Sequence, residues 1–241
     1  MKYAHDNWAE YYDFVYEQTF GQFYVNLTSE TLKVINQILV NGEIIDFGAG
    51  TGRLTIPLAE QAYKVIAVEK SEGMMNDLKR KLNNSDFKID LHNCSISDYQ
   101  NGKADLALAL FTVLSYSTTE KELFNNIKNI CNHIKPNGYF FFDLPNSIFF
   151  DRGRLINIDT MNFKRIVDLK STDKKDVYSY KEWCSGIFNG KEFNYQDEFE
   201  IRFWKLETLD KILVENGFKD TLTEFHQFGP TGSTYKLYKR L

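Results

Sequence analysis

Residues 43–70, EIIDFGAGTGRLTIPLAEQAYKVIAVEK, decide how this chain folds. An apolar run ends on Asp46, glycines follow at alternate positions from 48 to 52, and a helical pattern leads to a second apolar run that ends on Glu69. Strand, glycine turn, helix and strand, with an acid closing each strand, form the pattern of a nucleotide-binding βαβ unit.

The chemistry of such a unit explains its residue types. Glycines let backbone amides approach a ligand closely and adopt dihedral angles that a Cβ atom forbids. The turn also delivers the free N–H groups of a helix start to the ligand. Glu69 follows Asp46 at roughly the spacing, about 20 residues, at which an acid meets the hydroxyls of a ribose.

The spacing of the glycines separates two ligands. A nicotinamide or flavin fingerprint, GxGxxG, would place its third glycine at position 53, where this chain has Arg53. The GxGxG form after an acid resembles motif I of the class I S-adenosylmethionine (SAM) methyltransferases. The resemblance implies that Asp46 faces the methionine end of SAM and that Glu69 binds its ribose. The residues that it places under the cofactor are Gly48, Ala49, Gly50, Gly52 and Arg53.

Composition limits the other functions. The 241 residues suit one α/β domain with an insertion, or one and a half domains, and 43% apolar residues suffice for a core. The net charge of −4 argues against nucleic acid as the main partner. No apolar run reaches membrane-spanning length, the first residues are polar and do not predict a signal peptide, and the three cysteines form no CxxC pair. We expect a cytoplasmic protein with no membrane partner and no metal site.

The first 27 residues predict an aromatic N-terminal cap. Their aromatic side chains fall at helical spacing, which an ordinary packing helix would also explain. Many small-molecule methyltransferases begin with a similar Tyr-Asp segment over the cofactor, which favours Tyr12 as a cofactor contact, with Tyr11 and Tyr16 behind it. Tyr16 is also a candidate substrate contact.

Further cofactor contacts come from the resemblance alone. Lys70 and Met74 match the positions that flank adenine and ribose. The family usually has an acid against the adenine amino group, whereas this chain has Ser95, followed by Ile96; an alignment shifted by one residue would place Cys94 there. After the fourth apolar strand the segment 111–116 matches residues near the methyl group. It implies that Phe111 contacts the cofactor and that Leu114 and Tyr116 face substrate.

A second motif lies far from the first. The KPNG turn at 135–138 precedes an apolar strand and resembles the Leu-Lys-Pro-Gly-Gly turn before strand five of the family. The resemblance therefore spans nearly the whole chain. It implies a Rossmann-like α/β fold with a seven-stranded, mostly parallel sheet, an antiparallel last strand, and helices on both faces.

Residues 147–204 have a different pattern of polar and apolar residues from the segments on either side. We expect those segments, 1–146 and 205–241, to form the SAM-binding core. Polar residues alternate with aromatic or β-branched ones, and Asn189-Gly190 is a hairpin signal. We expect an antiparallel β insertion after strand five that serves as a substrate lid or a dimer contact. The side chains that could line a pocket there are Tyr178, Tyr180, Trp183 and Arg202.

The function implied is methyl transfer from SAM to the nitrogen or oxygen of a small-molecule acceptor, by a monomer or homodimer. The layout is similar to that of the sugar-amine and glycine-type N-methyltransferases. A SAM-binding sensor or scaffold without methyl transfer is the alternative. The catalytic candidates are His226 and Tyr12, and His5 also lies in a segment that could reach the site.

Overall fold

The computed structural model describes residues 3–83 and 85–241. Its centre is a seven-stranded sheet in which β11 runs antiparallel between β5 and β10, while the other neighbouring strands pair in parallel. In spatial order the strands are β10 (Phe218–Asp220), β11 (Ser233–Arg240), β5 (Ile134–Pro145), β4 (Ala104–Ala109), β1 (Glu43–Phe47), β2 (Lys64–Val68) and β3 (Asp90–His92). The predicted fold class is confirmed.

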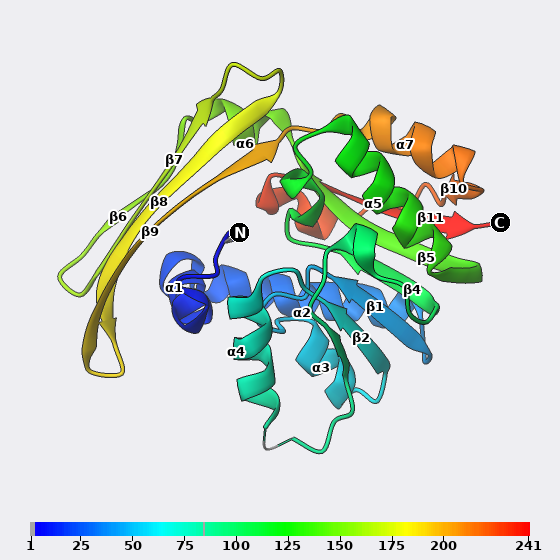
Figure 1. Cartoon of the computed structure of the whole chain (residues 1–241), viewed down its shortest axis with the longest axis horizontal. Coiled ribbons are helices and arrows are strands. Elements are labelled where there is room, and N and C mark those ends of the chain that lie inside the picture. Colours follow the sequence, from blue (N-terminus) through cyan, green and yellow to red (C-terminus); the bar gives the residue numbers. More distant parts are fainter. Residues whose placement is uncertain (1–2, 84) are drawn as a thin grey trace.

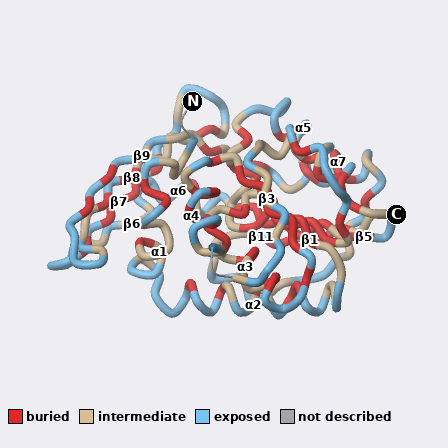
Figure 2. Tube along the Cα trace, turned by 60° about the horizontal axis from the view of Figure 1, so that its bottom comes forward, coloured by how far each residue is buried: buried red, intermediate tan, exposed pale blue. Residues whose placement is uncertain are grey.

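Helices cover both faces of this sheet (Figure 1). On one face lie α5 (Glu120–Asn132) and α7 (Leu206–Glu215); on the other lie α2 (Gln22–Ile38), α3 (Thr55–Glu60) and α4 (Glu72–Leu82). The central strands are buried on both faces, as their continuous apolar sequence requires, and Figure 2 shows the buried residues gathered along them. The carboxyl ends of β1, β2 and β4 consequently share one edge of a rigid core.

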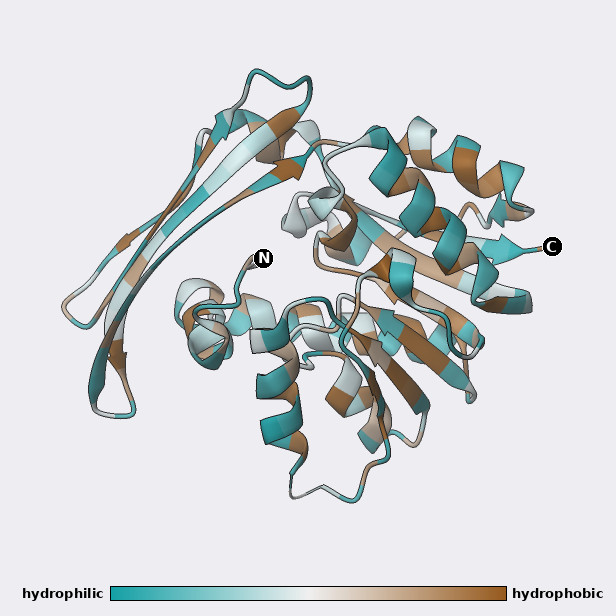
Figure 3. Ribbon diagram, viewed as in Figure 1, coloured by the Kyte–Doolittle hydropathy of each residue, from teal (hydrophilic) through white to brown (hydrophobic). Residues whose placement is uncertain are grey.

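A second, four-stranded antiparallel sheet projects from the core after β5 and the short helix α6 (Ser147–Asp151). Its strands are β6 (Arg154–Asp159), β7 (Phe163–Ser171), β8 (Val177–Phe188) and β9 (Lys191–Arg202). Asn189 and Gly190, both with positive φ, form the predicted hairpin turn. Figure 3 shows mixed hydropathy along these strands, in contrast to the hydrophobic strands of the core. We call this element the projecting sheet.

The N-terminal segment lies between the two sheets (Figure 1). Its helix α1 (Tyr12–Phe20) packs on the projecting sheet through a cluster that includes Trp8, Val15, Phe163 and Tyr195. The aromatic residues of the N-terminus therefore serve as a hydrophobic core between two elements that are far apart in sequence.

Helix boundaries bring one correction. The apolar spacing of residues 28–40 predicts a helix there that Thr28 or Ser29 could cap, but the helix begins earlier, at Gln22, directly after a bend at Gly21 with φ 50°. Thr28 therefore does not cap the helix; its hydroxyl donates to the Tyr24 carbonyl inside it, at 3.0 Å. The sequence also predicts a helix after Glu69 with Ser71 as its cap, and this is confirmed, because the Ser71 hydroxyl accepts from the Met74 amide at 3.1 Å. Within the described residues, no helix combines the length and the apolar character needed to cross a membrane.

Candidate active site

A cavity of about 330 Å³ lies at the carboxyl ends of β1, β2 and β4. This is the edge at which the strand order reverses between β1 and β4, the usual ligand site of open α/β sheets. We call it the first cavity. Of the predicted cofactor contacts, all but Gly52 line it: Tyr12, Asp46, Gly48, Ala49, Gly50, Arg53, Glu69, Lys70, Met74, Ser95, Ile96 and Phe111.

The glycine turn forms the floor of the first cavity. At Gly48, with φ 74°, an added Cβ would lie 2.4 Å from a methyl carbon of Val113, so only glycine fits. Gly52 has another reason to be glycine: a Cβ there would lie 2.5 Å from Leu78, inside the packing against α4. Gly52 therefore lets the turn pack closely and does not line the cavity.

Glu69 closes β2 with its carboxylate held on both oxygens. Oε2 accepts from the Gly50 amide at 3.0 Å, and Oε1 accepts from the Ser71 amide at 2.8 Å. Burial raises the pKa of Glu69, and the two N–H groups oppose that shift. Each carboxylate oxygen retains acceptor capacity, so the group can also meet the hydroxyls of a ribose.

Asp46 is the penultimate residue of β1 and is buried. Its Oδ2 accepts from the Thr55 hydroxyl at 2.7 Å, and burial raises its pKa to about 6. Beside it, the guanidinium of Arg53 lies 4.9 Å from the ring centre of Phe111 and 5.6 Å from that of Tyr24. This end of the cavity thus offers an acid and a cation, a pair that suits an amino-acid moiety.

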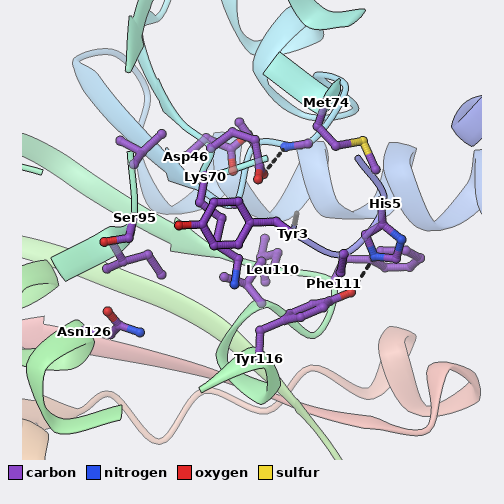
Figure 4. Close-up of a pocket in the computed structure, with 18 of the residues that line it drawn as sticks. Tyr3, His5, Asp46, Lys70, Met74, Ser95, Leu110, Phe111, Tyr116 and Asn126 are labelled. Atoms are coloured by element: carbon purple, nitrogen blue, oxygen red, sulfur yellow. Dashed lines mark hydrogen bonds between the residues drawn. The ribbon is translucent and has the colours of Figure 1, made fainter. Parts of the chain in front are cut away.

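The side of the first cavity away from His5 carries polar side chains, and Glu122 of α5 also lines the cavity. Figure 4 shows Ser95 and Asn126 on the side away from His5. The Ser95 hydroxyl donates to Asp98 at 2.6 Å. Cys94 and Ser95 both line the cavity, so either of them can be the residue that meets the adenine. Sequence reasoning missed Asn125 and Asn126 of α5, whose amides line the cavity here without any motif to mark them.

Phe111 owes its position to a buried acid that the sequence reasoning also missed. Phe111 and Thr112 have φ of 70° and 69°, which is rare for residues with a side chain. Their amides both donate to Asp143 Oδ1 of β5, at 2.5 and 3.1 Å. Asp143 therefore holds the chain in a left-handed bend that turns it across the edge of the sheet.

The start of the chain forms another wall of the first cavity. Tyr3, Ala4 and His5 line it, and Asp6 Oδ1 accepts from the Ser71 hydroxyl at 2.6 Å and from the Gly73 amide at 3.3 Å. The N-terminal segment is thereby attached to the first turn of α4.

A second cavity, of about 440 Å³, lies between the core, α1 and the projecting sheet. Its walls are largely aromatic and include Tyr16, Phe20, Tyr180 and Phe199. Four residues line both cavities: His5, Tyr24, Phe111 and Tyr116. We call these four the shared wall.

Within the shared wall, His5 and Tyr116 are joined by a hydrogen bond. The distance from His5 Nε2 to the Tyr116 hydroxyl is 2.7 Å (Figure 4). Burial, with Arg165 and Lys70 nearby, lowers the pKa of His5 to about 3, so its imidazole is neutral around neutral pH. Burial also lowers the pKa of Lys70, whose amine lies 5.4 Å from the Tyr116 ring centre.

Two of the five predicted substrate contacts, Tyr16 and Tyr116, line the second cavity. Leu114 does not; it is fully buried in the core between the sheet and α5. Trp183 lines neither cavity, because the two-residue period of β8 turns it away from the face that carries Tyr180.

Two further predicted site residues, Arg202 and His226, lie outside both cavities. Arg202 lies on the Trp204 ring, 4.1 Å from its centre, and donates to the Thr118 carbonyl at 3.2 Å, so it connects the projecting sheet to the core. His226, a predicted catalytic residue, has a side chain that is 85% exposed and pairs with Glu224 at 2.8 Å. It lines neither cavity. His5, the other histidine considered, occupies the shared wall.

Comparisons with known proteins agree with this geometry. Residues 44–138 match the family described as "Methyltransferase domain". YqeM of Bacillus subtilis (strain 168), a methyltransferase by name, is 23% identical over 214 residues, which is 82% of each chain.

Two solved structures share the fold. A SAM-dependent methyltransferase from Clostridium acetobutylicum ATCC 824 superposes with a TM-score of 0.79 at 20% identity, over 96% of this chain and 98% of that one. The sugar N-methyltransferase KedS8 from Streptoalloteichus sp ATCC 53650 gives 0.73 at 16% identity, over 95% and 92%.

The glycine turn, the acid at the end of β2 and the matched domain together define a class I SAM-dependent methyltransferase. Residues 44–138 match the methyltransferase domain, and the solved structures share the fold of nearly the whole chain. The predictions of the enzyme class and of SAM as cofactor are confirmed.

Proposed function

We propose that this protein transfers the methyl group of SAM to a small-molecule acceptor bound in the second cavity. One observation carries the proposal: two cavities meet at the shared wall of four residues. Both cavities have volumes within the usual range of ligand pockets. A sensor or scaffold that only binds SAM would need no second cavity there. SAM supplies an electrophilic methyl carbon on a sulfonium.

The residues of the first cavity have distinct parts in the proposal. Glu69 binds the ribose, while Asp46 and Arg53 face the amino-acid end of the cofactor. Ser95 or Cys94, with Ile96 and Met74, surround the adenine. Tyr12 stacks on Tyr16 with 4.4 Å between ring centres and packs beside the shared wall. Its role is to exclude water near the sulfonium.

The projecting sheet, residues 147–204, serves in this proposal as the acceptor lid. Tyr180, Phe199 and Ile201 of β8 and β9 line the second cavity, while the core supplies the opposite wall. Methylation of nitrogen and methylation of oxygen are both compatible with such a site. The cytoplasmic location and the monomeric or homodimeric state stay predictions.

The test incubates the protein with SAM labelled in its methyl group and, separately, with the low-molecular-weight and the macromolecular fractions of a cell extract. We expect label to appear in one small molecule, with equimolar S-adenosylhomocysteine (SAH) formed. Binding of SAM without any labelled product would instead favour the sensor. Label found only in nucleic acid or protein would contradict the choice of a small acceptor.

A further inference from the structure

Tyr116 and His5 form a hydrogen-bonded pair at the shared wall, and a third residue holds the pair in place. Asp197 of β9 approaches from the projecting sheet. Its Oδ2 accepts from the backbone amide of His5 at 2.8 Å and from the indole N–H of Trp8 at 2.9 Å. The same oxygen lies 3.6 Å from His5 Nδ1.

At 3.6 Å the Asp197 oxygen is too far from Nδ1 for a hydrogen bond, so the carboxylate acts on the choice of tautomer through its charge alone. A negative oxygen beside Nδ1 favours a hydrogen there and leaves Nε2 as an acceptor. Nε2 then accepts the hydrogen of the Tyr116 hydroxyl across 2.7 Å. The lone pairs of the Tyr116 oxygen remain available to accept a hydrogen bond from elsewhere.

Packing fixes the orientation of the imidazole. The His5 ring meets the rings of Trp8 and Phe199 edge to face, with centres 5.1 and 5.0 Å away. The backbone of His5 has φ 71°, a conformation that the Asp197 contact to its amide helps to hold. Because burial keeps this imidazole neutral, its acceptor nitrogen is not lost to protonation near neutral pH.

We propose that the Tyr116 oxygen, its own hydrogen committed to His5, accepts a hydrogen bond from the nucleophilic N–H or O–H of the acceptor at the point of methyl transfer. That contact directs the nucleophile's lone pair toward the methyl carbon, which is a matter of orientation. As the bond from the nucleophile to this carbon forms, the bond from the carbon to sulfur breaks and SAH leaves, and the nucleophile's proton stays on the product until water takes it. Tyr116 is then a catalytic residue, and His5 and Asp197 are positioning residues that act through it. The inference rests on the proposed function.

A cofactor analogue tests this without knowledge of the acceptor. Sinefungin carries an amine where SAM carries its transferable methyl group, and SAH carries nothing there. If the Tyr116 oxygen faces that point, Tyr116→Phe weakens sinefungin binding about tenfold, as for one lost hydrogen bond to a charged group. SAH binding changes less than twofold. Calorimetric titration of both ligands gives the affinity ratio, and unchanged SAH affinity also reports that the variant is folded.

The role of His5 is tested through the same ratio. His5→Asn should lower the preference for sinefungin over SAH in the otherwise unchanged protein. In the Tyr116→Phe background it should not lower that preference. A double-mutant cycle requires this of a residue that acts through Tyr116. His5→Gln has an amide oxygen with longer reach and should restore part of the preference. A merely structural role would change both ligands alike and in both backgrounds.

Tyr238→Phe is the matched control, since its hydroxyl donates to Asp210 at 2.8 Å outside both cavities. It should leave the ratio as it is. A ratio in Tyr116→Phe equal to that of the control overturns the inference. Failure to find any methylated small molecule would count against the proposed function alone, because the ratio is measured without an acceptor.

Discussion

The Glu69 carboxylate is the residue on which the assignment of the ribose depends most directly. It is buried at the end of β2 and already accepts two backbone N–H groups in the first cavity. We expect Glu69→Ala to weaken SAH binding by on the order of 1–3 kcal/mol, as for loss of a charge-assisted hydrogen bond. Isothermal titration calorimetry measures the change. Glu60→Ala, an exposed acid at the end of α3, serves as control, and equal affinity in both variants would remove Glu69 from the ribose.

His5 makes the stability of the protein depend on pH. Its pKa is about 3 in the folded protein against 6.5 when unfolded, chiefly through burial, with Arg165 and Lys70 adding to the shift and Asp6 opposing it. Between these values the unfolded chain binds a proton that the folded chain does not, so stability falls as the pH falls below 6.5. From pH 7.5 to 5 the wild type should lose about 2 kcal/mol more than His5→Gln.

Urea unfolding of both proteins at the two pH values measures this difference. Asp46, whose raised pKa of about 6 acts in the opposite direction, is present in both proteins and cancels. The same loss of stability in wild type and variant would show that His5 accepts a proton without cost in the folded state.

At the scale of elements, a buried ion pair attaches α1 to the projecting sheet. Arg165 Nε donates to Glu182 at 2.9 Å, and its Nη1 donates to Thr19 of α1 at the same distance. Both side chains of the ion pair are fully buried. Arg165→Met leaves the Glu182 charge unpaired and should destabilise the protein by about 3–5 kcal/mol in urea unfolding.

The double variant Arg165→Met/Glu182→Gln should recover most of that loss, because no charge is left buried while Tyr195 keeps an acceptor. Arg154→Met is the matched control in the same sheet: it breaks an exposed pair with Asp168 and should leave the unfolding midpoint unchanged. A double variant no more stable than Arg165→Met would mean that the arginine stabilises the sheet by packing and not by its charge.

Sequence patterns predicted the elements of the core because each pattern is local. The apolar runs and the Ser71 cap each lie within a few residues of the structure that they determine. The KPNG segment, predicted as a turn before the strand, is instead part of β5, where Asn137 has φ 65° and the register to β4 is irregular. Which face of the projecting sheet meets the second cavity was not predictable in the same way. Alternation assigns Trp183 and Tyr180 to opposite faces, but only packing against α1 shows which face meets the cavity.

The same limit applies to the site. Motif residues such as Gly48 and Glu69 could be placed by spacing, since one βαβ unit carries them. The contact of His5, Tyr116 and Asp197 joins residues more than 80 positions apart in three segments, and no local pattern records it. His226 was favoured only because of its position in a loop. Its side chain is exposed and lines neither cavity.

On the scale of the whole molecule, the N-terminal segment connects the cofactor site to the projecting sheet. Asp6 contacts α4 in the core, and His5 and Trp8 contact Asp197 in β9. We expect SAH, at 100 times its dissociation constant, to stabilise the protein by about 2.7 kcal/mol. We also expect it to slow amide hydrogen exchange in β8 and β9 as well as in α4.

Hydrogen exchange with mass spectrometry resolves these elements separately. In Asp197→Ala the protection of β9 by SAH should disappear while that of α4 remains. Glu200 lies on the same strand as Asp197 and pairs with Lys174, and Glu200→Ala should behave as wild type. Protection restricted to the core of the wild type would show that the two sheets respond to SAH independently.

The separation of the two cavities has a consequence for how many methyl groups one acceptor receives. The two cavities have their own walls and share only His5, Tyr24, Phe111 and Tyr116. On the proposed function, we expect spent cofactor to be exchanged while the acceptor stays bound to the aromatic walls of the second cavity. An amine acceptor would then be methylated twice without returning to solvent between the two transfers.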